Sequence, residues 1–311
     1  DSGRHLTFQI PQLSTLPLGP SGLHWMIFGA FLLAMAIKAP LWPFHGWMPD
    51  VYGKAPAPIT AMVAGVLSKA GIYGMMRLMV PLFGQEMHAI AGALLIWATI
   101  DLVYGGLIAL RQNDVKMITA YASLSHMGMM ALGVFTLTQA GLLGALFEMV
   151  AHGLMVAGLF IVLGILEQRT GTRNLSELGG INQSAPRLTA YTLFFVLAIL
   201  GLPGLPGFVG EYLILQGLIV AHQWVIAGVA GISIVLASWY MIRLFQGGFQ
   251  GPSPLRRQAV GDLSRLQVSA IVPLAAIVLL LGVWPAAVTQ MSAPSLYAAM
   301  HFIPGKGGIG V

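Results

Sequence analysis

The chain has 311 residues, of which 57% are hydrophobic and only 8% carry a charge. Soluble domains have roughly 45–50% apolar and about 25% charged residues, so this composition excludes the soluble classes and indicates a polytopic α-helical membrane protein. The net charge of +5 does not indicate a nucleic-acid partner, because Lys and Arg are scattered singly over short connections. Cysteine is absent, which excludes disulfides, thiolate chemistry and Cys-ligated clusters.

Eight apolar runs, each long enough to cross a bilayer, follow one another along the chain. Their predicted limits are residues 23–42, 59–80, 89–110, 115–136, 140–166, 188–220, 224–247 and 267–289. Residues 1–22 are predicted to form a non-membrane N-terminal segment, and residues 290–311 a C-terminal tail. The first residues show neither an initiator Met nor a signal-peptide pattern. We therefore expect the chain to be the later part of a longer protein.

The basic residues of the connections alternate between the two ends of the predicted spans. The connections near 81–88, 137–139 and 221–223 contain no Lys or Arg. Those at the other end contain Lys54, Arg111, Lys116, Arg169, Arg173, Arg187, Arg256, Arg257 and Arg265. Because cytoplasmic connections are enriched in Lys and Arg, the pattern predicts that this second set is cytoplasmic. Both chain ends are then expected on the non-cytoplasmic side.

Two spans are interrupted by a Pro-x-x-Pro step with an ionisable residue beside it. The first segment, from Lys38 to His45, reads KAPLWPFH; the second, from Gly201 to Glu211, reads GLPGLPGFVGE. Proline removes a backbone donor and clashes with the preceding turn, so the freed carbonyls need side chains, water or an ion. Paired broken helices in two halves of a membrane protein indicate an ion path near the midplane.

Several polar side chains within the spans recur at helical spacing. A charge at a helix centre costs about 2.5–3.5 kcal/mol on insertion scales, so such residues usually face a protein or aqueous interior. The predicted stripes are Lys69, Tyr73 and Arg77; then Lys116, Thr119, Ser123 and His126; and the i, i+4 pair Glu148 and His152. Titratable groups separated by water-sized gaps are suited to passing protons.

Structural roles remain open for some of these residues. Lys116 stands at a membrane edge, where a lysine is often a snorkelling anchor. Arg77 and Arg243 lie near span ends, where anchors and ion-pair partners are common. Asp101 has the option of pairing with a neighbouring Lys or Arg.

The remaining candidates divide between packing and function. His126 and His152, taken alone, fit hydrogen-bonded helix packing as well as proton transfer. Lys38, Lys69 and Glu211 favour a functional role, because we expect all three to lie deep and two of them adjoin a break.

Five segments form an ordered set of motifs. They read KAPLWPFHGWMPD from Lys38, with Ala-Pro at 55–56, GVLSKAGIYG from Gly65, DVKMITAYASLSHMG from Asp114, His152-Gly, and the second break. Together they resemble the proton-translocating antiporter-like subunits of respiratory complex I, over residues 23 to 289 or so. The FVGE ending of the second break and termination after the eighth span make the chain most similar to the M-type subunit, or chain 4, of NADH–quinone oxidoreductase within the Mrp antiporter superfamily.

The resemblance implies a fold of two inverted repeats, each containing a broken helix, with this chain beginning just before the seventh helix. We therefore expect an all-α polytopic membrane protein, an antiporter-like helical bundle with discontinuous helices. Residues 23–80 would be the last two helices of an incomplete first repeat, and residues 89–247 a complete second inverted repeat. Residues 267–289 would be the terminal transmembrane helix.

The resemblance also implies a role for individual residues in a proton relay. Lys38 matches the lysine of the first broken helix, and Lys69 the central lysine of the next helix. His126 and His152 match the central-axis histidines, and Glu211 the acid of the second broken helix.

Two features depart from the family pattern. The family's glutamate on the fifth helix, the partner of Lys38, has no counterpart in this chain. Glu148 stands where a neutral polar residue, commonly Gln, is expected. We expect Glu148 either to hold its neighbour His152 cationic or to be protonated itself. Lys116 is a further candidate for the relay.

The implied function is proton translocation by one subunit of an NADH:quinone oxidoreductase in the bacterial inner membrane. NADH, FMN, Fe–S clusters and quinone are expected in partner subunits, and we expect no cofactor, metal or redox centre in this chain. The expected partners are other membrane-arm subunits, including a second antiporter-like subunit, and the lipid bilayer, but no nucleic acid. The alternatives are an Mrp-type cation/proton antiporter subunit, an antiporter-like subunit of a membrane-bound hydrogenase or formate hydrogenlyase, and a structural spacer.

Overall fold

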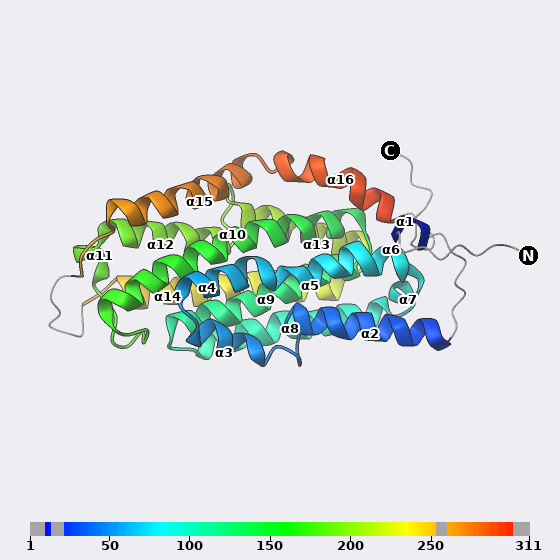
Figure 1. Ribbon diagram of the computed structural model, residues 1–311, viewed down its shortest axis with the longest axis horizontal. Coiled ribbons are helices and arrows are strands. Elements are labelled where there is room, and N and C mark those ends of the chain that lie inside the picture. The colour runs from blue at the N-terminus through cyan, green and yellow to red at the C-terminus, as the bar shows by residue number, and fades with distance from the viewer. Residues whose placement is uncertain (1–9, 14–21, 253–259, 301–311) are drawn as a thin grey trace, which may run out of the picture.

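The computed structural model describes residues 10–13, 22–252 and 260–300, and most of its helices run side by side along one axis (Figure 1). Much of the predicted N-terminal segment, the end of the predicted tail, and Arg256 and Arg257 lie outside the described residues. The helices are α1 (Ile10–Leu13), α2 (Gly22–Lys38), α3 (Trp47–Lys54), α4 (Ala57–Met62), η1 (Val63–Leu67), α5 (Lys69–Gly74), η2 (Met75–Met79), α6 (Val80–Leu82), α7 (Gly84–Ala89), α8 (Ala91–Arg111), α9 (Val115–Phe135), α10 (Gln139–Thr170), α11 (Ile181–Ser184), α12 (Pro186–Ile199), α13 (Pro206–Val220), α14 (Trp224–Phe249), α15 (Arg265–Val283) and α16 (Ala286–Met300).

Each of the eight predicted spans coincides with a helix or with helices in series, which confirms the all-α membrane architecture. In the described part, six helices are long and apolar enough to cross a membrane: Ala57–Leu82, Ala91–Arg111, Val115–Phe135, Gln139–Thr170, Trp224–Phe249 and Arg265–Val283. The shorter apolar helices α2, α12 and α13 belong to the two spans with breaks.

Both predicted breaks are present. Helix α2, the first predicted span, ends at Lys38 rather than at residue 42. The chain then continues as helix α3 in a region predicted to be a connection. The second break separates Ile199 from Pro206, and Pro206 occupies the first turn of α13, where a missing N–H costs nothing.

The span Ala57–Leu82 contains two π-helical turns, η1 and η2, on either side of α5. A π turn changes which residues share a face of the helix and is frequent at functional sites. Lys69 is only 4% exposed, whereas Tyr73 is 50% exposed and Arg77 is also exposed. The predicted stripe of these three residues is therefore wrong, because Lys69 faces the interior whereas Tyr73 and Arg77 face outward.

The centre of the bundle is formed by α9 and α10 (Figure 1). The Asp114 carboxylate caps α9 by accepting two backbone N–H groups of its first turn, and Thr138 caps α10 in the same way through the N–H of Gly141. The predicted stripe from Lys116 to His126 is buried throughout, which confirms that one polar face of α9 points into the protein.

Glycines allow α10 to approach the span Ala57–Leu82 closely. A Cβ atom on Gly153 would lie 2.5 Å from the backbone oxygen of Gly65, and one on Gly65 would lie 3.0 Å from the oxygen of Gly153. Small residues at such crossings let helix backbones touch in membranes. The crossing places Lys69, one turn beyond Gly65, beside the part of α10 that holds His152.

The connections at the predicted cytoplasmic end are fastened to one another. Asp114 and Asn174 form an isolated antiparallel bridge. Arg243, predicted to be an anchor or an ion-pair partner, donates to the backbone oxygen of Leu110 and to the Asn113 side chain. Side-chain hydrogen bonds thus join α14 to the connection between α8 and α9.

Asp262 joins the connection before α15 to the start of α12. Its carboxylate accepts backbone N–H groups from Arg187 and Leu188, each at 3.1 Å, and from Leu263 at 2.9 Å. Partial burial opposes ionisation, but these hydrogen bonds and the Arg187 charge outweigh it and hold the pKa of Asp262 below its usual value.

The predicted C-terminal tail contains a helix. After α15, residues Ala286–Met300 form α16, which packs against α10 and α6. Figure 1 shows α15 and α16 following one another along one side of the bundle.

Candidate functional site

Five buried titratable side chains meet in the apolar interior of the bundle. Lys69 comes from α5, His126 from α9, Glu148 and His152 from α10, and Glu211 from α13. None of them is more than 4% exposed. Such groups are costly within a membrane protein unless they interact with one another or with water, so their convergence distinguishes this region from ordinary packing. We refer to these five residues as the central cluster.

His126 lies between the two carboxyl groups of the central cluster. Its Nδ1 atom is 3.3 Å from Oε1 of Glu148 and 4.0 Å from Oε1 of Glu211. The rings of His126 and His152 lie with their centroids 4.6 Å apart. His126 therefore lies between the carboxyl group of Glu148 on α10 and that of Glu211 on α13.

This arrangement corrects the expected pairing of Glu148 with His152. The i, i+4 spacing places both residues on neighbouring positions of α10, but the described ion-pair contact of Glu148 reaches across to α9. Glu148 is thus the carboxyl group nearest to His126, and the rings of His126 and His152 are in contact.

Lys69 approaches the central cluster from the π-helical part of its span. Its ammonium group donates to the backbone oxygen of Ala64, and it lies 3.4 Å from the Ser68 hydroxyl. Lys69 is also close enough to Glu148 for Coulomb attraction. Since Glu148 contacts His126 as well, this carboxyl group connects the lysine with the histidine.

Two glycines of the second break make room for the carboxyl groups. A Cβ atom on Gly210 would lie 2.3 Å from Oε2 of Glu148, and one on Gly201 would lie 2.4 Å from Oε2 of Glu211. Gly201 also has a φ of 75°, which favours glycine. The glycines of the second break therefore shape the site as well as the chain.

Several polar atoms of the central cluster have no hydrogen-bond partner within the described protein. They include both ring nitrogens of His126, both carboxyl oxygens of Glu148 and Nδ1 of His152. A cavity of about 10 Å³ lies beside His126 and Glu211, lined also by Ser125 and Ser233, and it is comparable to the space of one water molecule. Buried polar atoms of this kind are normally satisfied by water, so the site is suited to hold a hydrogen-bonded water.

Comparison with known proteins places the chain in a family. Residues 4–237 match the family model described as NADH:quinone oxidoreductase/Mrp antiporter, transmembrane. The chain belongs to this family. It is 36% identical to NADH-quinone oxidoreductase subunit M of Pseudomonas aeruginosa over 96% of its length, and 34% identical to that of Rhodobacter capsulatus over 94%. In both comparisons it spans 58% of the relative.

Solved structures give the same assignment. A chain of respiratory complex I from Thermus thermophilus with bound NADH superposes with a TM-score of 0.89 at 35% identity, covering 96% of this chain and 63% of that one. A chain of the Mrp complex from Dietzia superposes with a TM-score of 0.85 at 23% identity, covering 97% and 64%, and shares the fold.

Two predicted relay residues of this antiporter-family chain lie outside the central cluster. Lys38 is the last residue of α2, which packs chiefly against α5 and η2, and it is exposed in the part of the chain that the structure describes. Because the chain spans only 58% of its relatives, the deep position and relay role of Lys38 stay predictions. Lys116 is buried but pairs with Glu167, 2.6 Å away, near the far end of α10. Glu148 and Glu167 are separated by about 28 Å along that helix at 1.5 Å per residue.

Asp101 has a role that the sequence did not reveal. Its Oδ1 atom accepts the backbone N–H of Trp42 at 2.8 Å, and Trp97, one turn earlier on α8, donates to the Trp42 carbonyl. Among the described residues it has no Lys or Arg partner, so the predicted ion pair is absent. α8 thus holds both backbone groups of one residue in the first break. The only available signal was an acid in an apolar span.

Proposed function

We propose that this chain translocates protons across a bacterial inner membrane as a subunit of an NADH–quinone oxidoreductase. The observation that supports the proposal is the central cluster: a lysine, two histidines and two carboxyl groups, contributed by four helices and enclosed by apolar side chains. An ordinary helix bundle does not need five ionisable groups in its interior, whereas a proton path does.

The geometry favours transfer in the order Lys69, Glu148, His126 and Glu211. Glu148 attracts Lys69 on one side and lies 3.3 Å from His126 on the other. The 4.0 Å between His126 and Glu211 is longer than a hydrogen bond but short enough for one bridging water, for which the adjoining cavity has room. A proton passing from His126 to Glu211 changes the charge that Glu148 and Lys69 experience.

Such a line must be gated, because each elementary charge that crosses 100 mV is worth about 2.3 kcal/mol. In this proposal the energy comes from quinone reduction in partner subunits, which would hold NADH, FMN, Fe–S clusters and quinone. The partners would include other membrane-arm subunits and a second antiporter-like subunit. By the distribution of Lys and Arg, both chain ends would face the non-cytoplasmic side.

The relatives favour an NADH–quinone oxidoreductase over an Mrp-type antiporter. The two relatives described above, at 36% and 34% identity, carry the name NADH-quinone oxidoreductase subunit M, whereas the Mrp likeness, at 23%, shows the fold alone. Purification of the chain with its native partners tests the choice: redox subunits are expected to copurify, and purification with antiporter subunits alone would reject it.

Replacing Lys69 with Met in the assembled complex tests the translocation proposal. The side chain keeps a similar volume and loses its charge, so we expect proton pumping per NADH oxidised to be lost in membrane vesicles. Arg77→Gln is a matched control, because Arg77 belongs to the same span but is exposed. Pumping at the wild-type rate by the Lys69→Met complex would reject the proposal.

A further inference from the structure

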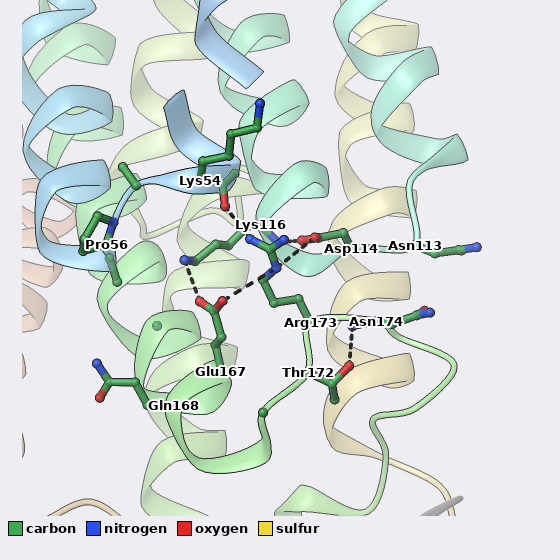
Figure 2. A pocket seen from close by; sticks show the side chains of 15 residues that line it. Lys54, Pro56, Asn113, Asp114, Lys116, Glu167, Gln168, Thr172, Arg173 and Asn174 are labelled. Carbon is green, nitrogen blue, oxygen red and sulfur yellow. Dashed lines mark hydrogen bonds and ion pairs between the residues drawn. The ribbon is translucent and has the colours of Figure 1, made fainter. Parts of the chain in front are cut away.

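A polar pocket opens at the end of the bundle where the predicted cytoplasmic connections meet (Figure 2). It has a volume of about 990 Å³ and lies between α3, the start of α9 and the end of α10. Its charged side chains are Lys54, Asp114, Lys116, Glu167 and Arg173. The pocket is separate from the central cluster, whose members do not line it.

The innermost charge of the pocket is Lys116. Its side chain is 4% exposed, and its ammonium group lies 2.6 Å from Oε2 of Glu167. Glu167 is 33% exposed, and its other oxygen lies 3.7 Å from Nε of Arg173. In Figure 2, Glu167 points toward both cations from α10. The carboxylate therefore faces the pocket and the buried lysine together.

The burial of Lys116 argues against the anchor role that its position suggests. A snorkelling lysine extends its ammonium group into water. The Lys116 ammonium instead lies deeper in the protein than the Glu167 carboxylate, which reaches the pocket. A buried ion pair must offset the desolvation of both groups and is weak evidence for stability, so its presence invites a functional explanation.

A polar stripe leads from Lys116 to the central cluster. Thr119, Ser123 and His126 follow on the buried face of α9, at most 3% exposed. The Thr119 hydroxyl donates to the Val115 oxygen and keeps its lone pairs, while the Ser123 hydroxyl has no partner among the described residues. At 1.5 Å per residue these positions are spaced about 4.5, 6 and 4.5 Å along the helix axis, and bridging waters would join each side chain to the next.

We infer that Lys116 and Glu167 take up protons from this pocket and pass them along α9 to His126. The inference rests on the proposed function and names the uptake side of that path. Lys116 releases a proton inward to water beside Thr119 and becomes a neutral amine. Glu167 takes a proton from hydronium in the pocket, leaving water, and gives it to the amine. The pair returns to its ionic form, and one proton has moved inward.

Charge-removing variants of the native complex test this inference. Glu167→Gln is expected to lower the number of protons pumped per NADH oxidised at least tenfold. Glu167→Asp, which keeps the carboxylate, is expected to retain part of the pumping. Glu177→Gln is the matched control, because Glu177 is an exposed acid in the same connection, bonded to Thr172. Wild-type pumping by Glu167→Gln, with Lys69→Met inactive, would overturn the uptake path alone. Wild-type pumping by Lys69→Met would overturn the proposed function itself.

A second measurement uses the absence of cysteine from the chain. A single thiol is introduced by Ser123→Cys, and Leu124→Cys places one on the neighbouring apolar face as a control. Silver ions are applied to native membranes, and the thiols left free are alkylated after denaturation. Silver is expected to protect the thiol at position 123 and not that at 124. Equal protection at both positions, or none at either, would overturn a hydrated path along α9.

Discussion

The contact between Glu148 and His126 predicts an energetic coupling that can be measured. Glu148→Gln and His126→Gln are made singly and together, with His152→Gln as the parallel partner. Two unit charges at the observed 3.3 Å attract by about 5 kcal/mol at an effective dielectric constant of 20. Desolvation offsets much of this attraction, so we expect a coupling of about 1–3 kcal/mol, or roughly 5- to 150-fold in rate.

The coupling is obtained from proton-pumping rates at matched rates of NADH oxidation, each ratio being converted to a free energy. Where a single variant no longer pumps, thermal unfolding midpoints of the purified complex provide the same cycle. Glu148 is expected to couple more strongly to His126 than to His152, because its described contact is with His126. A larger coupling between Glu148 and His152 would refute the arrangement and restore the pairing suggested by their spacing.

Three further predictions concern the scaffold around the site. Asp101→Ala leaves the Trp42 N–H without its acceptor and is expected to cost about 1–3 kcal/mol of stability, whereas Asp101→Asn, which keeps an acceptor oxygen, should cost less; equal thermal unfolding midpoints would contradict this. Gly153→Ala places a methyl group against the Gly65 oxygen and should destabilise the complex by about 1–3 kcal/mol in the same measurement, while an unchanged midpoint would mean that the helices do not touch. Since the pKa of Asp262 is lowered in the folded protein, its contribution is fully present above its unfolded pKa of about 3.9 and is lost as the pH falls through the lower folded value. The protection of the amides of residues 260–264 against hydrogen exchange, relative to their intrinsic exchange rates at the same pH, should therefore fall below about pH 4 in the wild type, and Asp262→Asn should show no such pH dependence in that range.

The breaks and the titratable residues were predictable because their signals are local. A Pro-x-x-Pro step disrupts the helical hydrogen bonds twice within one turn, so the steps at 40–43 and 203–206 marked the interruptions without knowledge of the neighbours, whereas the single Pro273 remains inside α15. Lys69 and Glu211 stood out because charges are rare in apolar spans. The central cluster contains five of the seven proposed residues, since burial of a charge already implies partners in the interior.

The partners themselves were not predictable, because they are chosen across the bundle. The i, i+4 spacing on α10 suggested that Glu148 contacts His152. In the structure α9 crosses α10 so that Glu148 lies next to His126 instead. The π turns were also hidden, since η1 and η2 have no distinctive composition, and the outward position of Tyr73 could not be read from its spacing to Lys69. The depth of Lys38 stays a prediction, because depth depends on what covers a helix end, which the sequence of that helix does not contain.

The contact between Glu211 and Gly201 has a mechanical consequence. With no side chain at position 201, the carboxyl group lies directly against the backbone of the break that introduces its own helix. The bend and the acid are therefore in steric contact, so a movement of the bend toward the carboxyl group would displace it. The second break is thus directly in contact with an ionisable group of the site, whereas the first break is bound at Trp42 by side chains of α8.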